Sequence, residues 1–378
     1  MAGTIMVTGC AGSVGHGIMN YLSVTHGVER IVGVDVNGTA GSRVVDEAIL
    51  ASNFMGFHPK IEFRSINLLD VDGNAEILKD VNPVVICHTA TLGSWWITHL
   101  LPPDICAKVI PLGPWVPNQV ILTLNLMQAV KRAGVDTRVI NGCYPDLSNV
   151  ILGKLGIAPT CGSGNMDHAC NYIKFVVSKE MNVPMGSISV YGVGHYGAFG
   201  TANMGEPYYV KILVGGQDVS DRFPHSKLKE MVRTANLRGS FHSQIKGPPP
   251  EQARTSASFA RSALDIYFGT GNVRMSVPAP NGLPGGYPCR LDSTGAEIVL
   301  PEDLTLPDAV RINEEGAKHD GIERVKDDGT VIFLDENVKR MNEVLGYQCK
   351  ELKVSELKQR SDELNDKLKK CYEKYAVK

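Results

Sequence analysis

The sequence lacks the features of a membrane, secreted or nucleic-acid-binding protein. It has no run of about 18 apolar residues, which argues against a membrane-spanning helix. Its 38 basic and 40 acidic residues leave a net charge of −2, so we expect no basic surface for nucleic acid. The first residues, MAGTIMVTGCAG, have no basic start and turn glycine-rich too early for a signal peptide. We therefore expect a cytoplasmic protein that binds neither membranes nor nucleic acid.

Paired cysteines are missing as well. The nine cysteines are scattered, odd in number and free of CxxC pairs, which is typical of reduced thiols rather than of a disulfide framework or a zinc knuckle. We therefore expect no metal site. The 378 residues, 43% of them hydrophobic, are enough to bury a large core and favour two domains.

A glycine-rich turn stands near the start of the chain. Residues 4–22 have the pattern of a buried strand, a glycine turn and a helix, with Gly9, Gly12 and Gly15 spaced as GxxGxxG. Such glycines allow a tight turn, a close approach of the backbone to a pyrophosphate, and close packing of helix on strand. The helix N-terminus then offers N–H groups and a positive dipole end to phosphates. This pattern predicts a dinucleotide site, and the alternative is a tight turn in another βαβ protein.

An acidic residue follows at the expected distance. Asp35 ends a second predicted strand, 30–37, and lies 20 residues beyond Gly15, where a carboxylate can accept hydrogen bonds from the adenosine ribose. It would repel a 2′-phosphate, so we expect NAD as the cofactor rather than NADP. Further strands at 83–90 and 137–143 should end at the same edge, although their end residues could equally be satisfied by backbone. The predicted cofactor-binding residues are Gly9, Cys10, Gly12, Ser13, Val14, Gly15, Asp35, Thr89 and Asn141.

The alternation of strands and helices predicts an α/β fold: a Rossmann-type doubly wound parallel sheet followed by an α+β catalytic domain. We place the NAD-binding domain at 1–150, the catalytic domain at 151–346 and a C-terminal amphipathic helix at 347–378. Apolar residues in that tail recur on one face among many charges, which is typical of a helix packed on the body or on a second subunit.

A histidine between glycines marks the middle of the chain. The stretch 187-SISVYGVGHYGAFG-200 predicts a strand that ends at His195, and an earlier predicted helix, 167–183, begins at Asp167. A histidine can exchange the proton of a secondary alcohol during hydride transfer, and a carboxylate on its other nitrogen would fix its tautomer. We expect His195 and Asp167 to form this relay, with His168 as an alternative to His195. The plain alternatives are a packed loop histidine and an acid at a helix start.

This order of motifs resembles the lactate/malate dehydrogenase superfamily, from the GCAGSVG turn to about residue 345. The resemblance implies a dehydrogenase in which an aspartate holds a histidine in an HG setting for proton transfer. The sequence departs from that family at the arginines that grip the substrate carboxylate. The position three residues after Asp167 is Cys170, and no arginine lies between Arg64 and Arg132.

The loop that should cover the substrate, 91–118, holds all three tryptophans. Trp95, Trp96 and Trp115 could close over a bulky, partly apolar substrate, or the loop could simply pack. We also consider Arg254, with Arg261 as a second candidate, as a replacement for the missing arginine. The residues expected to contact substrate are Trp95, Trp96, Trp115 and Arg254.

These observations predict an NAD-dependent oxidoreductase that acts on a secondary alcohol or ketone bulkier than lactate or malate, working as a homodimer or homotetramer. Three alternatives remain. An extended short-chain dehydrogenase or epimerase shares the TGCAGSVG opening but needs a tyrosine four residues before a lysine, and no tyrosine here meets this. An NAD- and metal-dependent glycosidase would use Cys161 or Cys170 with His195. A non-catalytic NAD-binding sensor would bind NAD without turnover.

Overall fold

A computed structural model describes residues 3–110, 113–199, 205–235 and 252–375, with the Trp95 side chain also outside the described part. Six parallel strands form the main sheet, in the order β3-β2-β1-β4-β5-β6. Their bounds are β1 Thr4–Thr8, β2 Arg30–Asp35, β3 Lys60–Ser65, β4 Val85–His88, β5 Arg138–Asn141 and β6 Cys161–Gly162. This order, with β1 between β2 and β4, confirms the predicted Rossmann-type sheet.

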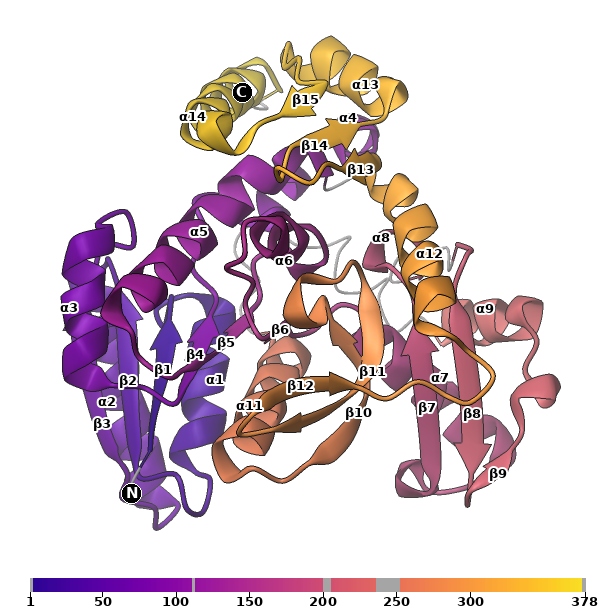
Figure 1. Cartoon of the computed structure of the whole chain (residues 1–378), viewed down its shortest axis with the longest axis horizontal. Coiled ribbons are helices and arrows are strands. Elements are labelled where there is room, and N and C mark those ends of the chain that lie inside the picture. Colours follow the sequence, from indigo (N-terminus) through magenta and orange to yellow (C-terminus); the bar gives the residue numbers. More distant parts are fainter. Residues whose placement is uncertain (1–2, 111–112, 200–204, 236–251, 376–378) are drawn as a thin grey trace.

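Helices cover both faces of this sheet because successive strand residues point to opposite faces. Met6 of β1 belongs to the core formed with α3 and α5, whereas Ile5 and Val7 belong to the core formed with α1, α2 and α11. Figure 1 shows α3 and α5 on one side of the sheet and α1 and α11 on the other. The bounds are α1 Ser13–Ser23, α2 Gly38–Phe54, α3 Val71–Val81, α5 Val116–Ala133, α6 Pro145–Lys154 and α11 Ala253–Phe268.

Two three-stranded antiparallel sheets follow, which confirms the predicted α+β part. One contains β7 Ile188–Val193, β8 Tyr209–Val214 and β9 Gln217–Asp218, and the other β10 Asn272–Pro278, β11 Gly286–Asp292 and β12 Gly295–Ile298. A bridge between Gly194 and Gly286 joins them just after β7 ends. The helices of this part are α7 Met166–Met181, α8 Tyr196–Phe199, α9 His225–Thr234 and α12 Leu306–Ala317, with a 3₁₀ turn η6 at Lys318–Asp320.

The C-terminal stretch packs on the sheet domain. It contains a small antiparallel sheet and two helices, shown at the top of Figure 1 beside α4 Pro103–Val109. Their bounds are β13 Ile322–Val325, β14 Val331–Phe333, α13 Asp335–Leu345, β15 Glu351–Leu352 and α14 Leu357–Tyr375. Leu357, Leu364 and Leu368 of α14 are buried in the same core as α5. The predicted domain boundaries stay a prediction.

Within the described residues, none of the helices combines the length and apolarity needed to span a membrane.

Candidate active site

The glycine turn after β1 is shaped by close backbone contacts. Gly9 has a φ of +76°, and its N–H donates to the Val34 carbonyl at 2.8 Å. A Cβ on Gly15 would lie 2.2 Å from the Gly9 carbonyl oxygen, so only glycine lets α1 approach the turn this closely. The sequence assigned these positions to the turn and to helix packing, and the structure gives them that geometry.

The N-terminus of α1 is open to an anion. Gly12 is exposed and stands at the N-cap, where no side chain in the described residues accepts the helix amides. Ser13 and Val14 are partly exposed, and the first turn carries no acid that would repel a phosphate. Unsatisfied amides and the positive dipole end make such a terminus suitable for binding a pyrophosphate.

Asp35 lies beside this turn, at the carboxyl end of β2. Its Oδ2 accepts a hydrogen bond from the Ala11 N–H at 3.1 Å, and its Oδ1 accepts one from the Asn37 N–H at 2.9 Å. These two bonds fix the carboxylate between the glycine turn and the start of α2. Asp35 remains partly exposed, so it retains acceptor capacity toward a ribose hydroxyl.

Three predicted cofactor residues have contacts within the protein. The Thr89 hydroxyl donates to the Thr8 carbonyl at 2.8 Å, and Cys10 is fully buried with its N–H donating to Val34. Burial raises the pKa of the Cys10 thiol to about 12. The Asn141 amide is fully buried and donates to Ser148 at 2.9 Å and to Asn149 at 2.8 Å. A cofactor contact by these side chains therefore stays a prediction, and Asn141 would have to exchange internal bonds for it.

A buried histidine also lies at this edge of the sheet. The Thr8 hydroxyl contacts His88 Nδ1 at 2.7 Å, and Thr123 contacts Nε2 at 3.1 Å. Burial lowers the pKa of His88 to about 3. Its two nitrogens are thus used to join β1, β4 and α5, which is a structural role.

His195 follows β7 and meets the sheet domain. The Asp146 carboxylate, in the first turn of α6 just after β5, accepts a hydrogen bond from the neighbouring Tyr196 N–H at 3.2 Å. His195 is fully buried, and its Nε2 has no hydrogen-bond partner among the described residues. Burial, with the nearby His319, lowers the pKa of His195 to about 3. The ring therefore lies beside the carboxyl edge of the parallel sheet, with one nitrogen that no described residue satisfies.

A carboxylate that the sequence did not single out contacts this ring. Asp320 Oδ2 lies 3.7 Å from His195 Nδ1 and accepts a hydrogen bond from the Tyr144 hydroxyl at 3.0 Å. Burial, together with repulsion from the nearby Asp320 carboxylate, raises the pKa of Asp146 to about 8. The site thus combines a histidine, a phenol and two carboxyl groups, none of which is more than 8% exposed.

Asp167, the predicted partner of His195, has other contacts. Its two oxygens lie 2.9 Å from Arg261, and Oδ2 accepts a hydrogen bond from the Ser258 hydroxyl at 2.7 Å. The predicted pairing therefore differs from the contacts seen, because α11 brings a cation to Asp167 while η6 brings Asp320 to His195. His168, the alternative relay, lies at the start of α7 with its Nε2 3.2 Å from the Thr255 hydroxyl.

The structure also explains the absence of an arginine at position 170. Cys170 is fully buried, and a Cβ on Gly192 of β7 would lie 2.3 Å from its sulfur. An arginine has no room there. Arg261 is engaged by Asp167, and Arg254 is exposed with its guanidinium 5.3 Å from the centre of the Tyr172 ring.

Several described residues of the loop 91–118 are buried in the core that α5 also lines. Trp115 is 5% exposed, and its indole N–H donates to the Val109 carbonyl at 2.8 Å. Asn118 bonds with Asn365 and Ser361 of α14, which holds the end of the loop. Trp115 is thus a core residue whose described contacts are within the protein, and its assignment to substrate binding stays a prediction. Trp96 is partly exposed, and the Trp95 side chain lies outside the described residues.

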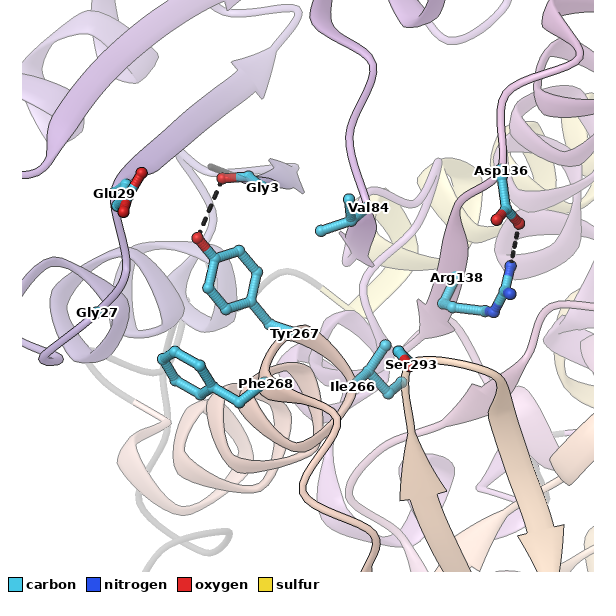
Figure 2. A pocket seen from close by; sticks show the side chains of 10 residues that line it. All are labelled: Gly3, Gly27, Glu29, Val84, Asp136, Arg138, Ile266, Tyr267, Phe268 and Ser293. Atoms are coloured by element: carbon cyan, nitrogen blue, oxygen red, sulfur yellow. Dashed lines mark hydrogen bonds and ion pairs between the residues drawn. The ribbon is translucent and has the colours of Figure 1, made fainter. Parts of the chain in front are cut away.

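A cavity of about 560 Å³ lies at the opposite edge of the sheet. It is lined where strands begin, by Gly3, Glu29, Val84 and Arg138, and by the end of α11. Figure 2 shows the Tyr267 hydroxyl bonded to the Gly3 carbonyl, at 3.1 Å, between these elements. This cavity is therefore separate from the edge that carries Asp35.

Sequence reasoning missed Asp320, Asp146 and Tyr144. Asp146 and Tyr144 follow a buried strand directly in 141-NGCYPD-146, a position that places them at the ligand edge of a parallel sheet and could have indicated them. Asp320, in 317-AKHDGIE-323, has no such signal, because it reaches His195 only through the packing of α12 and η6.

Comparison with known proteins agrees with this architecture. Residues 5–143 match the NAD dependent epimerase/dehydratase family, and this match runs from β1 to just after β5 and stops before His195. Malate dehydrogenase from Picrophilus torridus is 16% identical with a TM-score of 0.60, over 97% of this chain and 99% of that one.

Two further solved structures are similar. Lactate dehydrogenase from Eimeria maxima with NADH and oxamate is 14% identical, with a TM-score of 0.60 over 84% of this chain and 92% of that one. Malate dehydrogenase from Plasmodium falciparum in complex with NADH is 13% identical, with a TM-score of 0.57 over 97% and 99%. No curated protein matches the sequence as a relative. The chain therefore has the fold of the lactate and malate dehydrogenases.

Proposed function

We propose that the protein is an NAD-dependent oxidoreductase that transfers a hydride between nicotinamide and a secondary alcohol or its ketone. The observation that carries this proposal is the place of His195: a buried imidazole with an unpartnered Nε2 in the described structure, beside the edge where parallel sheets bind ligands. Similar proteins of this fold were solved with NADH or with lactic acid and NAD.

The residues around the glycine turn fit the cofactor. The exposed N-terminus of α1, from Gly12 to Val14, would hold the pyrophosphate, and Asp35 would accept hydrogen bonds from the ribose. NAD bound there supplies the hydride acceptor. His195 Nε2 takes the hydroxyl proton when the alcohol is oxidised and returns it when the ketone is reduced.

The charges around the histidine indicate the class of substrate. A small 2-keto acid needs a cation for its carboxylate, and a paired arginine is the strong solution. In this protein the buried Cys170 stands where the resemblance places the carboxylate-binding arginine, and Arg261 forms an ion pair with Asp167. Asp320 lies beside the ring and would repel a second carboxylate. We therefore propose an uncharged hydroxy or keto compound as the substrate. The prediction that the substrate is bulky depended on the three tryptophans, and Trp115 does not support it because its side chain is buried in the core.

The other candidate functions have less support. The match to the NAD dependent epimerase/dehydratase family favours the short-chain dehydrogenase or epimerase alternative but ends at residue 143, and no tyrosine in the sequence has a lysine four residues later. For the metal-dependent glycosidase, burial raises the pKa of Cys161 to about 12 and that of Cys170 further, although thiolates are the metal-binding form. The described residues contain no group of three metal-ligating side chains.

An exposed apolar patch supports a homo-oligomer. Ile49, Leu50 and Phe54 of α2 and the adjoining Met55 are exposed, Phe54 to 89%. Such a patch is typical of an interface. We therefore infer a homodimer or homotetramer. Light scattering of the purified protein tests this inference, and a monomer at micromolar concentration would contradict it.

Turnover of a panel of uncharged secondary alcohols, followed by NADH absorbance, tests the function. His195→Asn should lower kcat by about 10²–10⁴, the usual effect of losing a positioned acid or base, with the Kd for NAD unchanged. His168→Asn is the matched control and should retain activity. Unaltered turnover in His195→Asn, or efficient turnover of pyruvate or oxaloacetate, would contradict the proposal; NAD binding without turnover of any compound would favour the sensor.

A further inference from the structure

His195 Nδ1 has two neighbours of opposite hydrogen-bonding character. The Gly197 N–H donates toward Nδ1 at 3.1 Å, which requires a lone pair there and places the ring proton on Nε2. The Asp320 carboxylate, 3.7 Å from the same nitrogen, can only accept, which requires the proton on Nδ1. The two neighbours therefore favour different tautomers of the same ring.

The chemistry needs the tautomer that Asp320 favours. To take a proton from an alcohol, Nε2 must carry a lone pair, so the ring proton must be on Nδ1. Once Nε2 has taken that proton, the imidazolium is stabilised by a carboxylate on Nδ1 and not by an N–H. Asp320 meets both requirements.

Asp320 is held in place by specific packing. The Tyr144 hydroxyl donates to its Oδ2, and a Cβ on Gly197 would lie 2.5 Å from its Cγ. A Cβ on Gly316 of α12 would lie 2.8 Å from the His195 Cβ. Glycine at 197 and 316 is what lets η6 and α12 bring the carboxylate to the imidazole.

We propose that Asp320 is the positioning carboxylate of His195, in the role that the sequence assigned to Asp167. Asp167 serves the junction of α7 and α11 instead, through its ion pair with Arg261. This inference rests on the proposed function for its catalytic consequence, but the pairing itself is a structural statement. Asp146, Tyr144 and His319 are the other titratable groups of the described structure that face this pair.

The test compares Asp320→Asn with Asp167→Asn in the full-length protein. Asp320→Asn should lower kcat by about 10²–10⁴ with KM and the Kd for NAD within about threefold, because the ring loses its tautomer and not its binding site. Asp167→Asn should lower the melting temperature and leave kcat within about threefold. Gly197→Ala, which displaces the carboxylate and keeps its charge, should lower kcat in the same direction as Asp320→Asn.

A spectroscopic measurement separates this inference from the proposed function. The ¹⁵N chemical shifts of His195, assigned with His195→Asn, report which nitrogen carries the proton. In the NAD complex we expect Nδ1 to be protonated in the wild type and in Asp167→Asn, and Nε2 in Asp320→Asn. The same tautomer in all three proteins, or a larger loss of kcat in Asp167→Asn, would overturn the inference. A protein without turnover that shows these shifts would refute the proposed function and leave the pairing standing.

Discussion

Asp35 should make the protein prefer NAD to NADP, and replacing it by asparagine should remove most of that preference. The carboxylate is fixed by hydrogen bonds from Ala11 and Asn37 at the end of β2, so it cannot swing away from a 2′-phosphate bound at the same edge. Two unit charges about 4 Å apart repel by about 4 kcal/mol at an effective dielectric constant near 20 and by about 1 kcal/mol in water. Since Asp35 is partly exposed, we expect the repulsion to lie between these limits.

That repulsion corresponds to NAD binding about 5- to 1000-fold more tightly than NADP. Calorimetric titration of both cofactors measures the ratio in the wild type and in Asp35→Asn. The variant should gain affinity for NADP and lose some affinity for NAD, because asparagine is a weaker acceptor for the two N–H groups and for the ribose. The control is Asp46→Asn, which removes the same negative charge from an exposed residue of α2. Equal affinities for both cofactors in the wild type would remove Asp35 from the cofactor site.

Three further predictions follow from the same contacts. Gly15→Ala should lower the melting temperature because its Cβ would lie 2.2 Å from a backbone oxygen, whereas Gly12→Val should fold and bind NAD more weakly; melting curves and titrations distinguish the two. Asp146 has a folded-state pKa near 8 against an ordinary value of 3.8, so the native protein holds this proton more tightly and stability should fall as the pH rises from about 4 to about 8. Asp146→Asn should reduce the difference between the free energies of unfolding at pH 5 and pH 8, measured by urea unfolding. An unchanged difference would refute the burial argument. Trp115→Ala should lower the free energy of unfolding by about 3–5 kcal/mol, whereas Trp96→Ala should have a much smaller effect, and similar losses would contradict the core assignment.

Local sequence patterns predicted the sheet domain because its signals are local. The glycines of the turn and the apolar runs of β1 and β2 depend on neighbouring residues, and so does the place of Asp35 at the end of a strand. Each follows from strand periodicity, from the φ values that glycine allows, and from the proximity of strand ends in a parallel sheet. The fold class could be read from this alternation, and the structure has it.

The partner of His195 could not be predicted in this way. Asp167 is 28 residues from His195 and Asp320 is 125 residues from it, and nothing local distinguishes two aspartates at helix ends. The choice is made by packing: Arg261, on a helix that also covers the sheet, neutralises Asp167, while Gly197 and Gly316 admit η6 to the ring. Trp115 shows the same limit, since the turn that holds it contacts α13, which begins at Asp335 in the C-terminal part of the chain.

The sequence by itself therefore determined the parallel sheet, the open N-terminus of α1 and the histidine at the end of β7, because backbone geometry and residue spacing specify each of them. Only the tertiary structure decided which carboxylate faces His195 and which tryptophan lies in the core. Those outcomes depend on contacts between distant segments, where close approach and the pairing of buried charges select one arrangement from several that the sequence allows.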